Sequence, residues 1–513
     1  MVFTSFEFLV FFPLVLGMYF LFPVRTRWIQ LLLASYYFYM AWRPVYALLL
    51  LASTVSFYVA ALGVDRPIRE ARRKAIFFAA VAGNLAMLFA FKYFNFFEGQ
   101  FNTLADRLGL GLKIPVLDVL LPMGISFYTF QGISYLVDVY RRDMPAERHI
   151  GLLMLYKAFF PQLVAGPIER GTHFLPQLRH HLLEGAGTAT IRFEYDRVVS
   201  GLRLMLLGFF KKIVLADNFA LIVQPVYAAP DDYSGPSAIV ATLAFALQIF
   251  FDFSAYTDIA RGISRVLGFE LIENFKRPYF ARNIADFWQR WHISLSSWFR
   301  DYLYIPLGGN RVARWRWFMN LWIVFLLCGL WHGANWTFLI WGALHGFYYF
   351  LFYLLSPLAR WVADRSRLSR LPGVCGAIQI VFTFCLVCWA WVMFRAENLD
   401  QALAVWGSIA RTPAALVETV RLTVVDHVPV LPLQALGLEW LFTSAGRQTL
   451  MPVYVTVLTL LYLAISHRVR DEDDGPAFAR WGKGVRWASY FFALSAILLL
   501  GRFGAAPFIY FQF

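Results

Sequence analysis

The feature that most constrains the fold is a series of long apolar segments separated by short connections that hold most of the charge. A helix needs about 20 consecutive apolar residues to cross a bilayer. By that measure about a dozen spanning helices are predicted, near residues 6–22, 28–42, 44–63, 75–94, 119–137, 198–223, 237–256, 318–338, 339–355, 374–394, 449–466 and 487–503. The 513-residue chain is 59% hydrophobic and only 15% charged. We therefore expect an all-α polytopic membrane protein.

The basic residues indicate how these helices are oriented. They recur at alternate connections: Arg25 and Arg27; Arg66, Arg69, Arg72, Arg73 and Lys74; Arg141 and Arg142; Arg360, Arg365, Arg367 and Arg370; Arg468 and Arg470. Basic loops face the cytoplasm, so both termini are expected on the periplasmic or outer side. The net charge of +14 follows from these loops. Because no basic domain stands apart from the spans, nucleic-acid binding is not expected.

Two regions do not fit simple spanning helices. Residues 150–167 are apolar but interrupted by Pro161 and Pro167, which is typical of a re-entrant hairpin. Irregular backbone at membrane depth is tolerated only where protein or a water-filled cavity covers it. Residues 257–317 alternate aromatic and charged side chains. We expect them to form short helices buried in the cytoplasmic face, as the floor of a cavity.

The cysteines and histidines give little support to a metal site. All four cysteines lie in apolar runs, which argues against a disulfide framework. Cys385 and Cys388 have the spacing of a redox or zinc pair, but no second pair lies nearby, so packing is the preferred interpretation. The sequence has no His-Glu-x-x-His motif. No metal is expected.

His332 is an ionisable residue inside apolar sequence, Leu330–Trp336 (LWHGANW). Such a residue costs free energy unless it is paired or used, so it predicts a functional site within the membrane. His292 is the second candidate. A buried neutral imidazole can accept the proton of a hydroxyl that attacks a thioester, which favours acyl transfer. The alternative for both is a core histidine satisfied by hydrogen bonds, and this alternative has more weight for His292.

The other polar residues in apolar segments are expected to be structural. Asp252 and Asp258 need partners. They could orient a histidine or pair with Arg290 or Arg300, and pairing is favoured over direct catalysis. His345 is also expected to be structural. The remaining histidines fall in expected loops and indicate no function: His149, His173, His180, His181, His427 and His467.

Several longer motifs resemble a known family. They are Phe287–Ser296 (FWQRWHISLS), Arg300–Asn310 (RDYLYIPLGGN) and Gly329–Ala334 (GLWHGA), with Leu163–Ile168, Tyr256–Asp258 and Glu273–Tyr279 in support. Together they resemble the membrane-bound O-acyltransferase family, especially its bacterial alginate-acetylating members, over the whole chain. The resemblance implies one domain, 1–513, with a core at about 75–400, C-terminal helices at about 449–503 and a tail at 508–513. The implied fold is a ring of tilted helices around a tunnel.

The resemblance also implies roles for the two histidines. His332 corresponds to the essential histidine of the family. His292 occupies a position that is histidine in bacterial members and often asparagine in eukaryotic ones, so it is the less secure catalyst.

The last six residues, Phe508–Phe513 (FIYFQF), contain four aromatic side chains. They resemble a Phe-x-Tyr-x-x-Phe ending of bacterial acyl-export systems, in which the tyrosine is proposed to carry the acyl group. The chemistry permits this, because a phenol, with a pKa of about 10, is a better leaving group than a sugar hydroxyl. Docking of the tail back into the protein is an equally open interpretation.

We therefore expect an inner-membrane O-acetyltransferase that relays acetyl from cytoplasmic acetyl-CoA to an exported polysaccharide. His332 would act as general base with help from His292. Tyr510 would pass the acetyl group to a periplasmic SGNH-type acetyltransferase. Arg290 and Lys276 are candidates to bind the donor's phosphates, although helix-end pairing or lipid contact explains them equally well. The alternatives are a D-alanyl transferase acting from a carrier protein and a proton-coupled transporter.

Overall fold

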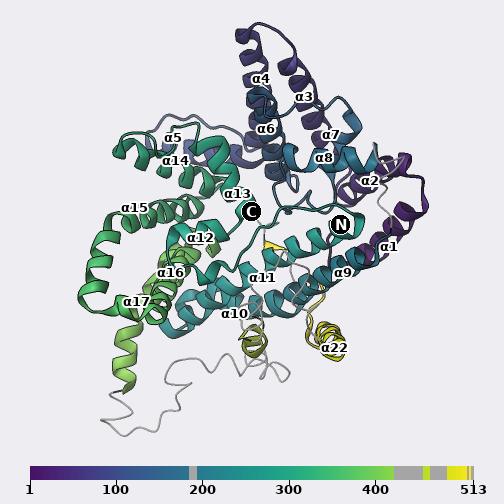
Figure 1. The fold of residues 1–513 in the computed structure, drawn as a ribbon. Coiled ribbons are helices and arrows are strands. Elements are labelled where there is room, and N and C mark those ends of the chain that lie inside the picture. The colour runs from purple at the N-terminus through teal and green to yellow at the C-terminus, as the bar shows by residue number, and fades with distance from the viewer. Residues whose placement is uncertain (184–192, 421–454, 461, 463–481, 505–507, 510–513) are drawn as a thin grey trace.

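In the computed structural model, the regular elements of the described residues are helices (Figure 1). The structure describes residues 1–183, 193–420, 455–460, 462, 482–504 and 508–509. The helices are α1 (Phe6–Leu21), α2 (Val24–Met40), α3 (Tyr46–Asp65), α4 (Glu70–Leu88), α5 (Phe94–Arg107), α6 (Ile125–Arg141), α7 (Ile150–Ala158), α8 (Gly171–Leu182), α9 (Tyr195–Phe209), α10 (Asp217–Ala228), α11 (Gly235–Leu267), α12 (Ile284–Arg290), α13 (Ile293–Phe299), α14 (Arg314–His332), α15 (Trp336–Arg365), α16 (Pro372–Arg395), α17 (Leu399–Val420) and α22 (Lys483–Leu500). Three π-helical turns, η1 (Phe89–Tyr93), η3 (Phe210–Ala216) and η6 (Arg300–Tyr304), and three 3₁₀ turns, η4 (Pro230–Asp232), η5 (Pro278–Phe280) and η7 (Leu368–Arg370), complete the set.

Six of the described helices are long and apolar enough to cross a membrane. They are Tyr46–Asp65, Glu70–Arg107, Gly235–Leu267, Trp336–Arg365, Pro372–Arg395 and Lys483–Leu500. Their outer faces expose large apolar side chains; Leu499, for example, is 81% exposed. A lipid environment accounts for such surfaces. The predicted class, an all-α polytopic membrane protein, is confirmed, whereas the predicted number of spans is not.

Several predicted boundaries are wrong. The span at 75–94 belongs to a continuous helical segment, Glu70–Arg107, which passes through η1. The span at 198–223 is divided into α9, η3 and α10. The floor region was expected to begin at 257, but α11 continues to Leu267 and ends at Gly268, whose φ of +92° is a left-handed cap. Most of the predicted span 449–466 lies outside the described residues.

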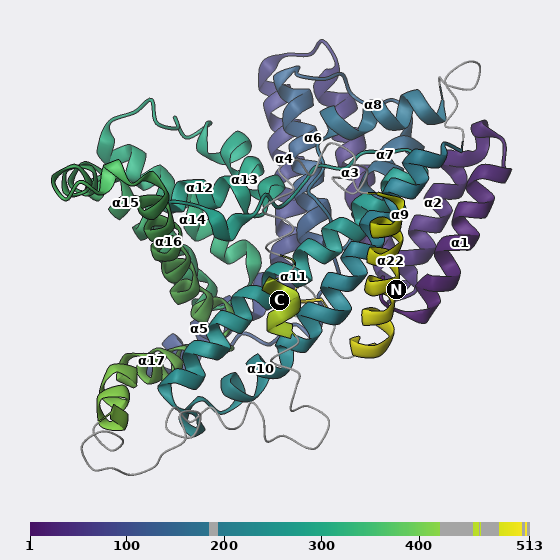
Figure 2. The same ribbon diagram turned by 60° about the horizontal axis from the view of Figure 1, so that its bottom comes forward.

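The elements form two groups joined by the long helix α11. Helices α1 to α4 and α6 to α8 gather on one side, and α14 to α17, with α5 beside them, on the other (Figures 1 and 2). Helix α11 packs against α9, α10, α16, α17 and η3. The short helices α12 and α13 lie between the two groups in both views. The predicted floor segment therefore occupies the middle of the molecule from residue 268 onward.

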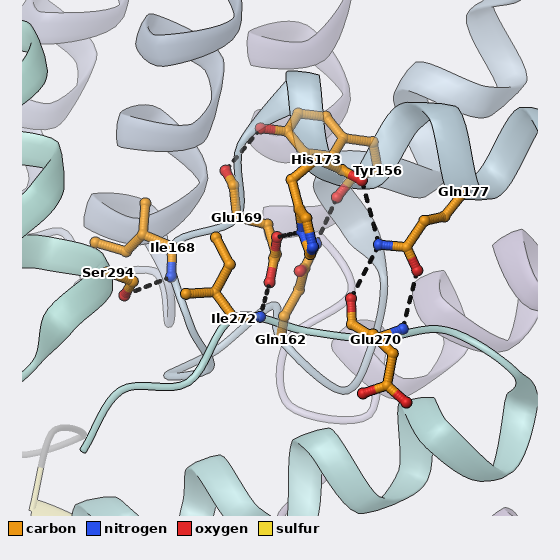
Figure 3. Close-up of polar contacts among 9 residues, drawn as sticks. All are labelled: Tyr156, Gln162, Ile168, Glu169, His173, Gln177, Glu270, Ile272 and Ser294. Carbon is orange, nitrogen blue, oxygen red and sulfur yellow. Dashed lines mark hydrogen bonds and ion pairs between the residues drawn. The ribbon is translucent and has the colours of Figure 1, made fainter. Parts of the chain in front are cut away.

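The predicted re-entrant segment is a short helix, α7, followed by an irregular chain. Residues 155–170 are all buried, as irregular backbone at membrane depth requires. Two of its polar side chains bond within the segment: the Tyr156 hydroxyl donates to the Glu169 carbonyl at 2.9 Å, and the Gln162 amide donates to the Tyr156 carbonyl at 2.7 Å (Figure 3). This segment forms one wall of the region that contains His292.

Candidate functional site

His332 is the last residue of α14. Gly333 follows in an extended conformation, and the Asn335 side chain caps α15 by accepting a hydrogen bond from the Thr337 backbone N–H at 3.1 Å. The imidazole is 4% exposed. Its centroid lies 5.1 Å from the rings of Trp341 and Phe394. The helix ends here because the chain turns back to form α15, and this turn places His332 inside an aromatic cluster.

His292 lies beside His332, with ring centroids 6.5 Å apart. The prediction from sequence that these two residues share a site is consistent with this geometry. His292 is fully buried and contacts the ring of Phe253 at 4.7 Å. Aromatic surroundings disfavour a charged imidazolium. The two rings are close enough for one hydroxyl group to lie within reach of both.

The backbone of His292 is strained and held in place. Its φ of +44° is left-handed, which costs about 1–3 kcal/mol for a residue other than glycine. Asn274 fixes the next two residues: its carbonyl accepts from Ile293 N–H at 3.0 Å, and its side-chain oxygen accepts from Ser294 N–H at 3.2 Å. The Ser294 hydroxyl accepts from Ile168 N–H at 2.9 Å (Figure 3). The buried loop, the floor segment and His292 therefore form one connected unit.

Lys92 is a site residue that the sequence analysis missed. Its ammonium group donates to the carbonyl of Trp331 at 2.6 Å and to that of His332 at 3.1 Å. The neighbouring Tyr93 hydroxyl donates to the Leu330 carbonyl at 3.1 Å. A lone lysine in an apolar run is by default a functional candidate, so the sequence did contain a signal for Lys92. It was overlooked because the residue lies inside the predicted span 75–94.

Asp252 and Asp258 are paired, as expected, but their predicted partners are wrong. Asp252 pairs with Lys212 at 2.7 Å, and Asp258 pairs with Lys211 at 2.7 Å. The two predicted arginine partners instead bind neighbours in sequence: Arg290 binds Asp286, and Arg300 binds Asp301. The lysines lie on η3, which packs against α11. The sequence does not reveal that tertiary contact.

The C-terminal tail enters the interior next to Asp252. Tyr510 lies outside the described residues, but Phe508 and Ile509 are buried. The Ile509 backbone N–H donates to the Asp252 carboxylate at 2.6 Å, and the Phe508 ring lies 5.0 Å from that of Tyr256, nearly perpendicular to it. The docking interpretation is confirmed for these two residues. The carrier role of Tyr510 stays a prediction.

The two candidate phosphate-binding residues lie together at a partly exposed edge. The backbone N–H of Lys276 donates to the carbonyl of Arg290 at 2.9 Å. Each side chain already has an acidic partner: Lys276 lies 3.4 Å from Glu273, and Arg290 lies 2.6 Å from Asp286. Lys276 is 56% exposed and Arg290 33% exposed. A phosphate would have to compete with these carboxylates.

A charged cavity lies close to this edge. It is lined by Lys211, Phe250, Ser254, Thr257, Asp258, Arg261, Glu273, Asn274, Phe275, Arg277, Pro278, Tyr279, Phe280 and Tyr462. Neither histidine lines it. The rings of Phe275 and Phe253, 5.1 Å apart, link the cavity to His292. Within the part of the chain that the structure describes, no group of three His, Cys, Asp or Glu side chains could hold a metal ion.

The remaining described histidines have structural contacts. His345 is buried and accepts a hydrogen bond from the Trp288 indole at 3.3 Å, in keeping with its expected role. Of the described histidines that were expected in loops, His149 lies in a loop as the N-cap of α7, whereas His173, His180 and His181 lie within α8. His173 binds the Glu169 carboxylate at 2.8 Å (Figure 3). This hydrogen bond raises the pKa of His173.

Comparison with known proteins identifies the family. The MBOAT, membrane-bound O-acyltransferase family matches residues 152–393. The chain is 41% identical to a probable alginate O-acetylase AlgI from Azotobacter vinelandii, covering 80% of this chain and 78% of that protein. It is 35% identical to the Pseudomonas putida protein of the same name over the full length of both chains. It is also 36% identical to a peptidoglycan O-acetyltransferase from Helicobacter pylori, covering 73% and 72% respectively.

The matched region includes both histidines, the buried loop, the floor segment and most of the helices that surround them. The apolar helices are consistent with the membrane location that the family name states. The chain belongs to the membrane-bound O-acyltransferase family and is a membrane-embedded acyltransferase.

Proposed function

We propose that the protein takes acetyl from cytoplasmic acetyl-CoA and relays it across the bacterial inner membrane for O-acetylation of an exported polysaccharide. The observation that carries this proposal is the meeting of His292 and His332, with ring centroids 6.5 Å apart, inside a protein whose relatives are named O-acetylases. The names of those relatives support a cell-envelope glycan, alginate-like or other, as the final acceptor.

The chemistry is general-base acyl transfer. An acceptor hydroxyl attacks the thioester carbonyl while His332 takes its proton, which increases the nucleophilicity of the oxygen. The tetrahedral intermediate then expels the thiolate of coenzyme A, which recovers the proton from the imidazolium. One ester and one free thiol result. His292 orients the acceptor or stabilises the imidazolium from the opposite side.

Tyr510 is the proposed first acceptor, and its phenol ester passes the acetyl group to a periplasmic SGNH-type acetyltransferase. The buried position of Phe508 and Ile509 supports this role, because Asp252 holds the tail one residue away from Phe253, which contacts His292. The basic loops predict a topology in which both termini lie on the periplasmic side. Arg290 and Lys276, at the partly exposed edge, would bind the phosphates of the donor.

Access requires side-chain movement. Both imidazoles are almost fully buried, and the aromatic pair Phe253 and Phe275 lies between the charged cavity and His292, so we expect the thioester to pass this pair. Aromatic rings can rotate without changing the backbone. We expect this pair to be displaced when the donor binds.

Transfer of label from radiolabelled acetyl-CoA to the purified protein tests the proposal. The wild type should acquire acid-stable label, His332→Ala should acquire none, and Tyr510→Phe should lose the label on the tail. His180→Ala is the control, because this histidine is exposed on α8. Label that is independent of His332 would refute the role of the base. Proton flux without any acyl transfer would favour a transporter.

A further inference from the structure

Lys92 contacts the candidate general base, His332, although the two residues are far apart in the sequence. It lies in η1, the π-helical turn Phe89–Tyr93 within the continuous helical segment Glu70–Arg107. Its ammonium group reaches the end of α14, which is about 240 positions away in sequence. It donates to two successive carbonyls there and lies 3.5 Å from the Ser126 hydroxyl.

The C-terminal end of α14 is a favourable place for a cationic donor such as Lys92. The last carbonyls of a helix have no intrahelical partner, and they carry the negative end of the helix dipole. In apolar surroundings each unsatisfied carbonyl costs free energy. Here the carbonyls of Leu330, Trp331 and His332 are satisfied by two neighbouring side chains, Tyr93 and Lys92. The π turn brings both onto the same three carbonyls, and such turns are frequent at functional sites.

The positions of the two acceptors give Lys92 control over His332. The Trp331 carbonyl belongs to the peptide group before the Cα of His332, and the His332 carbonyl belongs to the peptide group after it. Holding both peptide groups restricts φ and ψ of that residue together. The direction in which the imidazole leaves the backbone then depends on one ammonium group.

We propose that Lys92 is a positioning residue that orients the His332 imidazole for acyl transfer. This inference rests on the proposed role of His332 as general base. Lys92 contacts the backbone of His332 and orients the ring, so it is not itself a catalytic residue. Without it, the end of α14 would lose two hydrogen bonds and the imidazole would sample other directions.

The test separates orientation from folding. Lys92→Met keeps the length of the side chain but removes the donors, and it should lower kcat about 10- to 100-fold with the KM for acetyl-CoA nearly unchanged. Lys92→Arg should recover part of the loss because it restores charge and donors. The matched control is Lys157→Met: Lys157 is also buried and donates to Ser53 at 2.7 Å, but it belongs to α7. It should lower stability with little effect on kcat.

The outcomes are distinguishable. If His332→Ala remains active, the proposed function fails. If His332→Ala is inactive and Lys92→Met keeps the wild-type kcat, the positioning role fails. If Lys92→Met does not fold, Lys92→Gln serves in its place, because its shorter neutral amide keeps a donor but cannot hold both carbonyls as the ammonium group does. A several-fold lower kcat at constant KM would then support the inference, and an unchanged kcat would overturn it.

Discussion

Replacing Gly329 with alanine should inactivate the protein without unfolding it. Helices α14 and α15 approach closely at this glycine: a Cβ there would lie 2.2 Å from the backbone oxygen of Phe338. The backbones must separate by about 0.8 Å before that contact reaches even 3.0 Å. His332 lies one turn further along α14, and its ring packs against Trp341 on α15. A displacement of about 1 Å at a reacting group can lower the rate about 100-fold.

The assay measures acetyl transfer and thermal unfolding on the same preparations. Gly329→Ala should lose about 100-fold in kcat and about 1–3 kcal/mol in the free energy of unfolding, as overpacked sites do. Gly346→Ala is the matched control, because it lies on the same helix pair but its Cβ would meet its nearest neighbours at an ordinary 3.6 Å. If both variants have the same activity and the same melting temperature, the reasoning about helix approach is wrong.

Three further predictions concern the groups around the histidines. His292→Asn should fold, because asparagine tolerates a φ of +44°. His292→Val should lower the free energy of unfolding by at least about 1–3 kcal/mol, because a β-branched residue does not. Equal melting temperatures of the two variants would contradict this. Asp252→Asn should expose the tail to carboxypeptidase by weakening its hold on Ile509, with Asp258→Asn as the control that leaves the tail protected. The raised pKa of His173 predicts a stabilising contribution that is complete below the unfolded pKa of about 6.5 and is lost as pH rises through the folded pKa. The melting temperatures of wild type and His173→Gln should therefore converge at alkaline pH, and a constant difference would refute the role of the Glu169 bond.

The sequence was a good guide to the features that depend on composition and on local pattern. Long apolar runs predicted a helical membrane protein, since lipid leaves few alternatives for the backbone. The two histidines were found because an imidazole in apolar sequence is costly unless it is used. The segment around Pro161 and Pro167 was recognised as irregular for a related reason: proline removes a backbone donor.

The features that were missed depend on which elements pack together. A single lysine among phenylalanines does not interrupt a hydropathy window, so Lys92 was hidden inside a predicted span. The π-helical turns have no local signature, although η1 and η3 place the lysines that bind α14 and α11. The aspartates of α11 were correctly expected to need partners. Their choice of Lys211 and Lys212 follows from the packing of η3 on α11, which is a tertiary property.

Three departures from regular helix meet at the two imidazoles: the π turn at Phe89–Tyr93, the left-handed backbone of His292, and the break between α14 and α15 at residues 333–335. Each departure is unfavourable in a membrane, because it leaves backbone groups without helical partners. Side chains compensate two of them: Lys92 and Asn335 satisfy the two sides of the break, at the end of α14 and the start of α15, and Asn274 binds the peptides after His292. Three unfavourable backbone features at one place indicate that this region is built to hold a particular geometry rather than to be as stable as possible. The groups that satisfy this irregular backbone also fix the directions of both rings, so residues that never touch a substrate should control kcat.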